Sequence, residues 1–575
     1  MSIAIVSVGL YWPARGAGFV GDDFMILHRL QGLTAPGDLL PFFRAEFFQY
    51  YRPLGFVSHA LDWLAAGADP GRFHLTNIVL HAINAAFVLL IAQALSPRSL
   101  AGPLAALLFA VHASNHEAVV WVSARFDLLA TAFGLAAVCW MVRGWPGSRW
   151  APALLFFAAL LSKESSVALP LVPLAWAAFV LNERTRDAAL RAAPWLAALV
   201  AYSVLREVAG GISAVGGASR LPKVAVLGLA IVMVLALSGG RWQGARAWLV
   251  QRRATAAVVA AASLTAALLG ALVLDGAAGH LLREKLSVAG FAAFYLTTPL
   301  LDDGSAVFSD PTTSFYYLGG AAGLASCSTL LLLFWRPLLG DGRFWFIGVM
   351  LFASLLPVSA LTEGKRYLYL PSAGFSILLG LVIVELPGRW RKVAVAVTGV
   401  VLAVSAVQVH LKIRDWIWAG TMTADGARLV DAALAPACDE GHVVFLTSPV
   451  GIRGVYTHFY YETFELPRGC IPEVFQVVAR VQRHDIGMSA RWDGPGRIVM
   501  TVPHYAWQFV AARDFRVFDI AIGASNRQVV DTALGRLESE PDGSGLRLTL
   551  TLAGQIRQDP PHFFYYSAGE IRRLE

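Results

Sequence analysis

The sequence predicts a polytopic α-helical membrane protein that carries a C-terminal soluble α+β domain. Hydrophobic residues make up 57% of the 575 positions and charged residues only 15%, and the mean hydropathy is +0.58. Such values exclude an ordinary soluble globular protein. The net charge of +7 does not indicate a nucleic-acid partner, because lysine and arginine stand between apolar runs instead of clustering on a polar surface.

Apolar runs predict about 11–13 transmembrane helices, since a helix needs about 20 apolar residues to cross the hydrocarbon core. We expect the segments at 1–20, 76–95, 101–113, 117–142, 150–162, 165–181, 192–206, 221–238, 254–274, 313–335, 344–361, 366–386 and 393–410. Segments 101–113 and 150–162 are short, which favours broken or tilted helices. The apolar run 286–301 is expected to enter the membrane and return on the same side.

Basic residues indicate how these segments are oriented. They are concentrated in alternate loops, for example Arg184, Arg186 and Arg191, or Arg389, Arg391 and Lys392. The positive-inside rule places these loops in the cytoplasm. The N-terminus is then inside, and the loop after residue 20 and the C-terminal domain are outside. We therefore expect a multi-pass membrane protein with an external C-terminal domain, which in a bacterium means the inner membrane and the periplasm, and in which Cys438 and Cys470 can pair.

The first external loop, about 21–75, begins with two adjacent acids, Asp22 and Asp23, where the first apolar segment ends. Its aromatic residues predict interfacial helices, and Arg52 stands among them. From His74 onward, polar residues recur at helical spacing (74, 77, 81, 84) and form one stripe that enters the membrane. Polar side chains are costly in lipid, so the stripe should face a cavity or another helix.

Charged residues next appear inside the predicted segment 117–142. Arg125 and Asp127 lie about two turns within it, and buried ionisable groups in membranes are usually paired and functional. Before them stand His112, His116 and Glu117. These three residues are either metal ligands or structural hydrogen-bonding groups, and the absence of a further partner nearby in the sequence favours the second reading.

Two external turns carry cations. Lys163 and Glu164 lie between segments 150–162 and 165–181, and this pair either binds a phosphate or solvates a turn. The turn before segment 366–386 sets Lys365 and Arg366 at a helix N-terminus, a position that favours anions. Arg366 is the better anion ligand of these two, because a guanidinium binds phosphate through two parallel hydrogen bonds.

Taken in order, these motifs resemble one superfamily. The acid pair, Tyr50-Tyr51-Arg52-Pro53-Leu54, His74-Leu75-Thr76-Asn77, the run 112–127, Ser162-Lys163-Glu164-Ser165 and Arg366-Tyr367-Leu368-Tyr369 are similar to the GT-C glycosyltransferases. More narrowly, residues 1–410 resemble the transmembrane and tetratricopeptide-repeat O-mannosyltransferases and their bacterial relatives. No repeat array follows residue 410, which leaves the acceptor open.

The resemblance implies a hexosyl- or pentosyltransferase that moves a sugar from a polyprenyl-phosphate carrier to an external protein, glycan or lipid hydroxyl, with inversion. The base in that family is the acid of the first external loop, and here this role falls on Asp22 or Asp23, with Asp22 favoured. Arg366, with Lys163 or Arg125, is expected to hold the donor phosphate. Arg52, His74, His112, His116, Glu117, Asp127 and Glu164 are expected to line the cavity or contact the acceptor.

No cofactor is required by this chemistry, because a glycosyl phosphate already carries a good leaving group. Asp23 either orients the acceptor, raises the pKa of its neighbour by repulsion, or holds a divalent cation together with Asp22. Rival functions are a transporter or flippase of lipid-linked sugars, and a ligase or polymerase of surface polysaccharide. The sequence lacks the matching halves with interrupted helices that are typical of transporters.

The composition changes after residue 410, and we expect residues 411–575 to form the external domain. Short β-like runs at 443–446, 498–502, 515–522 and 546–552 alternate there with glycine, proline and aspartate turns. The part with these runs, 436–575, is about 140 residues long, which is enough for a separate hydrophobic core.

Overall fold

The computed structural model describes most of the chain up to residue 438 and parts of the remainder. The described residues are 2–44, 51–146, 149–209, 295–296, 341–357, 364–438, 443–446, 451–452, 455–456, 473–481, 489–502, 505–511, 517–520, 528–532, 534–542, 545–558, 560–567 and 570–575. The chain forms two compact units. The helical unit comprises 1–15, 32–302 and 313–411, and the second unit comprises 16–31, 303–312 and 412–575.

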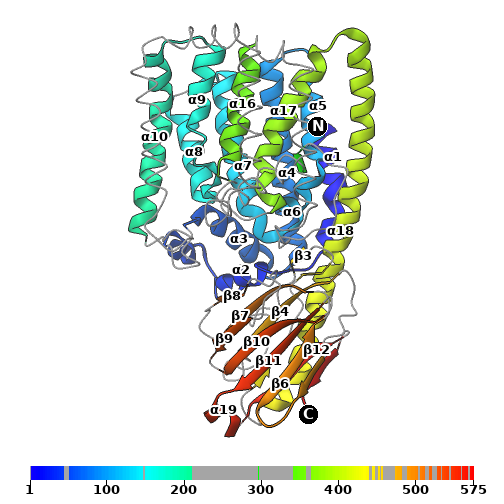
Figure 1. Ribbon diagram of the computed structural model, residues 1–575. Coiled ribbons are helices and arrows are strands. Elements are labelled where there is room, and N and C mark those ends of the chain that lie inside the picture. Colours follow the sequence, from blue (N-terminus) through cyan, green and yellow to red (C-terminus); the bar gives the residue numbers. More distant parts are fainter. Residues whose placement is uncertain are drawn as a thin grey trace, which may run out of the picture. The chain divides into compact units, whose positions relative to one another are not determined.

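The helical unit is a bundle in which α4, α5, α7, α8, α10, α16 and α17 run side by side (Figure 1). Its helices are α1 (Ser2–Tyr11), α3 (Pro53–Ala66), α4 (Pro70–Leu95), α5 (Ala101–Ala110), α6 (His116–Val120), α7 (Arg125–Arg143), α8 (Trp150–Ser162), α9 (Leu171–Ala175), α10 (Thr185–Val208), α16 (Gly342–Leu355), α17 (Tyr369–Glu385) and the first part of α18 (Gly388–Cys438). Short 3-10 segments lie between them, notably η4 (Val122–Ala124), η5 (Glu164–Ser166) and η8 (Lys365–Leu368).

Within the described residues, five helices are long and apolar enough to cross a membrane. They cover Pro70–Leu95, Val122–Arg143, Arg186–Val208, Lys365–Glu385 and Gly388–Ala433, and four shorter apolar helices accompany them. The predicted membrane class is therefore confirmed. The expected segments 221–238, 254–274 and 313–335 lie outside the described residues, as does the predicted re-entrant run 286–301 apart from Tyr295 and Leu296.

Several predicted segments have different boundaries in the structure. The first was expected at 1–20, but α1 ends at Tyr11, because Pro13 disfavours helix in the residue before it. The segment at 165–181 consists of η5, the five-residue α9 and a π-helix at Trp176–Val180, and two prolines interrupt it. The last segment, expected at 393–410, belongs to the much longer α18.

The segment expected at 117–142 is also divided, and this changes the position of its charges. Helix α6 ends at Val120, and α7 begins at Arg125 after η4. The prediction that Arg125 and Asp127 lie two turns inside a membrane helix is therefore wrong. Both side chains stand in the first turn of α7.

The second unit contains two sheets, which confirms the predicted α+β character of the C-terminal part. One is an antiparallel sheet of order β5-β6-β11-β10-β9, and the other follows the path β13-β12-β1-β4-β2-β3, with β7 and β8 attached through β4. The strands are β1 (Val443–Phe445), β2 (Gly451–Ile452), β3 (Val455–Tyr456), β4 (Glu473–Val481), β5 (Ser489–Trp492), β6 (Arg497–Val502), β7 (Tyr505–Ala511), β8 (Val517–Ile520), β9 (Gln528–Thr532), β10 (Gly535–Asp542), β11 (Gly545–Leu552), β12 (His562–Ser567) and β13 (Glu570–Arg573).

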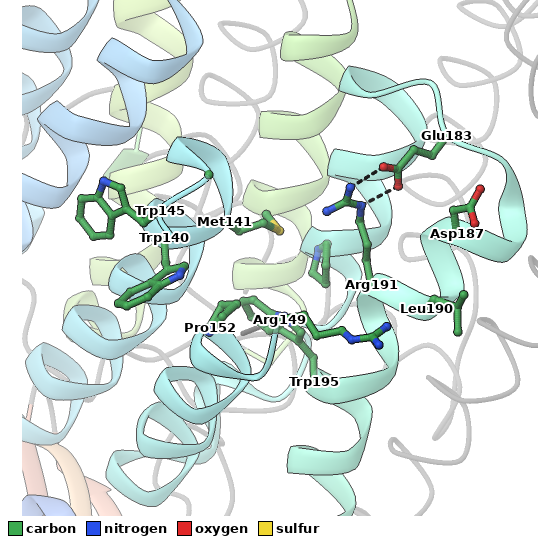
Figure 2. Close-up of a pocket in the computed structure, with 12 residues that line it drawn as sticks. Trp140, Met141, Trp145, Arg149, Pro152, Glu183, Asp187, Leu190, Arg191 and Trp195 are labelled. Carbon is green, nitrogen blue, oxygen red and sulfur yellow. Dashed lines mark hydrogen bonds and ion pairs between the residues drawn. The ribbon is translucent and has the colours of Figure 1, made fainter. Parts of the chain in front are cut away.

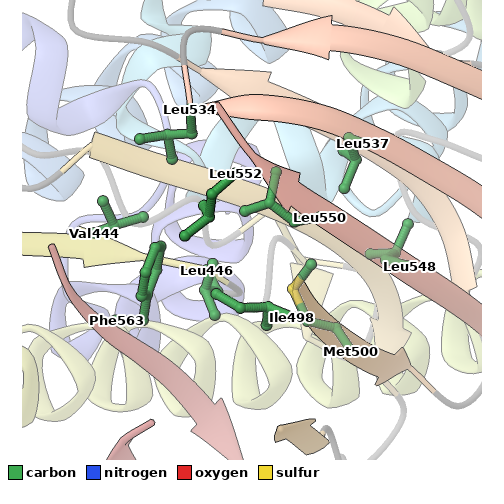
Figure 3. Close-up of a cluster of buried hydrophobic side chains, with 10 residues drawn as sticks. All are labelled: Val444, Leu446, Ile498, Met500, Leu534, Leu537, Leu548, Leu550, Leu552 and Phe563. Atoms are coloured by element: carbon green, nitrogen blue, oxygen red, sulfur yellow. The ribbon is translucent and has the colours of Figure 1, made fainter. Parts of the chain in front are cut away.

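A core joins these two sheets (Figure 3). Leu548, Leu550 and Leu552 alternate along β11 and are buried, as expected when one face of a strand is turned to the interior. They pack with Val444 of β1 and Phe563 of β12. Together these residues provide the separate hydrophobic core that the length of this region predicted.

The second unit also includes the acid-bearing segment 16–31 with helix α2 (Asp23–Leu30). Gly18 lies against Gly420 of α18, and a Cβ added to Gly420 would stand 2.5 Å from the Gly18 nitrogen. Two glycines therefore allow the backbones of the two segments to approach closely. Any larger side chain at position 420 would push the acid-bearing segment away from α18.

Candidate functional site

Six charged residues from separate elements of the helical unit form three ion pairs, which we call the ion-pair cluster. Its members are Arg52, Glu117, Asp127, Lys163, Glu164 and Arg366. Each of them stands at or near the end of a helix, so its side chain can lie at the polar end of the bundle. The sequence had selected all six as candidate site residues.

Lys163 and Asp127 form the most enclosed of these pairs. Lys163 follows α8, Asp127 lies in the first turn of α7, and the Nζ–Oδ2 distance is 2.6 Å. Both side chains are more than nine-tenths buried. A buried pair of this kind is retained only where each charge compensates the other, so Lys163 does not merely solvate a turn.

Arg52 and Glu164 are joined by two hydrogen bonds. Arg52 directly precedes α3, and its Nε donates to Glu164 Oε2 at 2.9 Å, while Nη2 donates to Oε1. The Arg52 guanidinium also lies 5.6 Å from the centre of the Phe126 ring. Glu164 follows Lys163 in the chain, so these two ion pairs share one turn.

Arg366 connects the third pair to the others through an aromatic ring. Its Nη1 donates to Glu117 Oε1 at 2.6 Å, and its Nη2 donates to the hydroxyl of Tyr367 at 3.0 Å. The Tyr367 ring lies 4.5 Å from the Arg366 guanidinium and 4.8 Å from Lys163 Nζ. Tyr367 therefore stands between two cations of the cluster. The sequence motif contained this tyrosine, but its role had not been predicted.

Glu117 also orders the backbone that carries Arg366. Its Oε2 accepts a hydrogen bond from the Lys365 nitrogen at 3.0 Å, and the Arg366 guanidinium lies 4.6 Å from the Trp121 ring. The Lys365 ammonium lies 4.8 Å from the ring of Tyr295. Glu117 thus fixes the backbone of the turn before α17 and compensates the positive charge of Arg366.

Arg125, the third predicted phosphate ligand, lies in a different environment. Its side chain is fully buried and forms an ion pair with Asp62 at 2.7 Å. It also donates to Asn77 Oδ1 at 2.8 Å and to the carbonyl oxygens of Phe73 and Ser58 at 2.7 and 3.1 Å. These contacts tie α3, α4 and α7 together, which is a structural role. Asp62 was not predicted, because an acid in an amphipathic loop helix carries no signal of its own.

The predicted polar stripe on α4 faces other helices and loops. Asn77 donates to the carbonyl oxygens of Val119 and Trp121, and His81 contacts the Tyr369 hydroxyl at 2.7 Å. Asn84 donates to the same hydroxyl at 3.2 Å. His74 is buried on the same helix. The stripe therefore fastens α4 to α17 and to the turn after α6.

The histidines before α6 are held by local hydrogen bonds. His112 Nδ1 accepts from the Ser114 backbone nitrogen, its Nε2 contacts the Leu296 carbonyl oxygen at 3.3 Å, and His116 Nδ1 contacts the Ala113 carbonyl oxygen at 2.7 Å. The described residues include no group of three or more His, Cys, Asp or Glu side chains that could hold a metal ion. The hydrogen bonds of His112 and His116 agree with the hydrogen-bonding interpretation of this motif.

Asp22 and Asp23 belong to the second unit and differ in burial. Asp23 is fully buried, and its Oδ2 accepts a hydrogen bond from the Val20 nitrogen at 3.0 Å. Asp22 precedes α2 and is only partly buried. Asp23 therefore stabilises the turn, whereas the Asp22 carboxylate remains more accessible.

Cys470, the predicted partner of Cys438, lies outside the described residues.

Sequence comparison relates the chain to a set of named transferases. No family model matches it. It is 32% identical over 173 residues to the protein O-mannosyl-transferase Tmtc1 of Drosophila melanogaster and 34% identical over 146 residues to TMTC3 of Mus musculus. These matches cover 28% and 24% of this chain but only 20% and 16% of the relatives, so the aligned part spans a fifth or less of their length. The resemblance to membrane O-mannosyltransferases inferred from the motifs is confirmed.

Two solved structures resemble the chain at low identity. The oligosaccharyltransferase AglB of Archaeoglobus fulgidus, in complex with an inhibitory peptide and a dolichol-phosphate, has a TM-score of 0.41 and 13% identity over 78% of this chain and 61% of its own. ArnT of Cupriavidus metallidurans, bound to undecaprenyl phosphate, has a TM-score of 0.42 and 13% identity over 83% of this chain and 92% of its own.

Proposed function

We propose that the chain is a membrane glycosyltransferase that moves a sugar from a polyprenyl-phosphate carrier to an external hydroxyl, with inversion. The observation that carries the proposal is the convergence of Lys163 and Arg366 on Tyr367 at one end of the helical bundle. The similarity to proteins named O-mannosyl-transferases supports the reaction class. The acceptor is a protein Ser or Thr, a surface glycan or a lipid.

In this reaction the acceptor hydroxyl gives its proton to a carboxylate, and its oxygen forms a bond to the anomeric carbon. The bond from that carbon to the phosphate oxygen breaks, and polyprenyl phosphate leaves with the electron pair. A phosphate leaves without general acid assistance when cations stabilise its developing charge. The chemistry thus requires one base and a cationic phosphate site.

We assign the phosphate site to the ion-pair cluster, with Arg366 as its main ligand and Lys163 as its second. Arg366 is held by side chains, those of Glu117 and Tyr367, and by the faces of aromatic rings. Side chains can rotate when a phosphate arrives, and the guanidinium then offers its planar pair of donors to the new anion. We do not assign Arg125 to this role, because its present partners include Asp62 and two backbone carbonyl oxygens.

We assign the base to Asp22. The family resemblance points to the acid pair, and the burial of Asp23 against the Val20 nitrogen favours its neighbour. This assignment requires no metal ion. Loss of turnover after chelation would instead indicate a divalent cation at the acid pair.

The test is release of polyprenyl phosphate from a labelled lipid-linked sugar by purified, reconstituted protein. Asp22→Asn should lower turnover by about 10²–10⁴-fold, the range for loss of a general base. Asp69→Asn is the matched control, since Asp69 also precedes a helix in the first loop, and it should keep normal turnover. Full activity of Asp22→Asn would remove this residue from the mechanism, and movement of the lipid-linked sugar without release of polyprenyl phosphate would favour the transporter.

The membrane orientation needs its own experiment, because the donor must be reached from outside the cytoplasm. A reporter fused after Glu575 should be periplasmic, and reporters near Arg186 or Arg391 should be cytoplasmic, as the distribution of basic residues predicts. A cytoplasmic C-terminus would invert the predicted topology and the assigned face of the reaction.

A further inference from the structure

The helical unit contains a second polar site, far from the ion-pair cluster. A cavity of about 520 Å³ lies between the ends of α7, α8 and α10 (Figure 2). Its volume is within the range of sites that bind small molecules or lipid headgroups, roughly 300–1,000 Å³. Its walls include Trp140, Trp145, Arg149, Glu183, Asp187 and Arg191.

The direction of the helices places this cavity near the opposite membrane surface. Helix α7 begins at the ion-pair cluster and ends at Arg143, next to the cavity, after 19 residues. At about 1.5 Å per residue this is roughly 28 Å, close to the thickness of the hydrocarbon core. Helix α8 returns from Arg149, at the cavity, to Lys163 in the cluster. The length of α7 therefore puts the cavity near the headgroup level of the other leaflet, and α8 runs between the same two ends of the bundle.

The walls of the cavity divide into an aromatic side and a charged side. Figure 2 shows Trp140 and Trp145 on one side and the charged groups of Arg191, Glu183 and Asp187 on the other. Tryptophan is typical of the membrane interface, where one edge of the ring is wet and the other is apolar. Such a wall can cover the glycerol region of a lipid.

The charged side presents both signs. Arg191 Nε donates to Glu183 Oε2 at 2.6 Å, which neutralises this pair. Arg149 and Asp187 are exposed at the rim, on the turns before α8 and at the start of α10. A purely anionic ligand would meet two carboxylates here, and a purely cationic ligand would meet two guanidiniums. A ligand that carries one charge of each sign matches the rim.

An apolar surface continues from the rim along α10. Leu190 lines the cavity, and Val200 and Val204 are exposed one after another on the same face, as their spacing requires. Leu154 is exposed on α8. A soluble ligand would leave these side chains unused, whereas the acyl chain of a lipid can lie along them.

We propose that this cavity binds the headgroup of a zwitterionic phospholipid. Arg149 pairs with the phosphate, Asp187 accepts from the ammonium, and the tryptophans cover the glycerol backbone. This site is separate from the proposed sugar transfer, and its test does not depend on that activity.

The experiment is native mass spectrometry of the detergent-purified chain titrated with three probes: phosphatidylethanolamine, phosphatidylglycerol and soluble glycerophosphoethanolamine. The wild type should retain phosphatidylethanolamine in preference to the other two. Arg149→Gln should weaken binding of both lipids by about tenfold, as expected for loss of one charge-assisted hydrogen bond. Asp187→Asn should reduce the preference for phosphatidylethanolamine over phosphatidylglycerol and leave the latter bound.

Arg186→Gln is the matched control, because Arg186 adjoins Asp187 on α10 but does not line the cavity. Unchanged lipid affinity in Arg149→Gln would overturn the site. Equal or tighter binding of phosphatidylglycerol by the wild type would overturn the zwitterionic ligand. Equal binding of the soluble headgroup would overturn the lipid. All three substitutions are at exposed positions. Loss of binding that came from a folding defect would be accompanied by a lower unfolding temperature, whereas loss of the site alone would leave that temperature as it is in Arg186→Gln.

Discussion

Arg125 and Arg366 illustrate two ways of holding a guanidinium inside one helical unit. Arg125 is bound by Asp62, Asn77 and two backbone carbonyl oxygens. Arg366 is bound by the side chains of Glu117 and Tyr367 and lies against aromatic faces. Backbone acceptors inside helices cannot turn away, but a carboxylate and a phenol can. Burial alone therefore does not identify an anion site, because it also matters whether the groups that already bind the guanidinium can move.

The largest effect is expected when Arg125, the rigidly held arginine, is replaced. Arg125→Met should lower the free energy of unfolding by about 3–5 kcal/mol, because the buried Asp62 would lose its buried cation and keep only the half-exposed Arg72. Thermal unfolding in detergent measures this loss. Arg72→Met is the control, since Arg72 binds the same Asp62 from an exposed position, and it should cost less than about 1 kcal/mol. Similar losses in both variants would contradict the structural role of Arg125.

A smaller effect should appear in the pH dependence of the same region. His59 lies on α3 and is fully buried. The pKa of His59 is lowered from the ordinary 6.5 to about 3, first because the side chain is buried and second because the positive charge of Arg125 is nearby, while hydrogen bonds to the carbonyl oxygens of Val122 and Gly55 act in the opposite direction. The unfolded chain therefore takes up a proton below pH 6.5 that the folded chain refuses. Stability is complete above that pH and falls towards pH 3.

The slope should be at most about 1.4 kcal/mol per pH unit, so that roughly 2 kcal/mol is lost between pH 7.5 and pH 5. Unfolding measured at these two values should show this loss in the wild type and a weaker dependence in His59→Gln. The same dependence in both proteins would assign it to other groups.

The smallest effect is expected at Arg366, whose present partners are side chains that can rotate. Arg366→Lys should keep the pair with Glu117 and the fold, but weaken binding of a purified lipid-linked sugar by about tenfold, since an ammonium lacks the planar pair of donors. Arg366→Ala should weaken binding further. Arg343→Lys is the control, as Arg343 also holds carboxylates, Asp341 and Glu385, at the other end of α17. Normal affinity in Arg366→Ala would move the phosphate site to Lys163.

Several features of the chain were accessible from the sequence. Hydropathy and charge spacing predicted the membrane bundle, and alternating apolar residues predicted strands such as β6 and β11, because these patterns reflect local burial. The residues of the ion-pair cluster were also selected, since charged residues in or beside apolar segments are unusual and these stand in the motifs that carry the family resemblance.

Helix boundaries were less accessible. The break between α6 and α7 has no proline to mark it, and it moved Arg125 and Asp127 from the interior of a helix to its first turn. Boundaries of this kind depend on capping and packing more than on local propensity.

The sequence by itself determined which side chains are charged and that they must avoid lipid. Only the tertiary structure decided their partners: Arg366 with Glu117 across 249 positions, Arg52 with Glu164 across 112, and Arg125 with Asp62 in preference to any ligand. It also buried Asp23 while leaving Asp22 accessible. The physical reason is that a sequence states how much charge a segment carries, whereas the compensation of that charge depends on which helix ends are packed together.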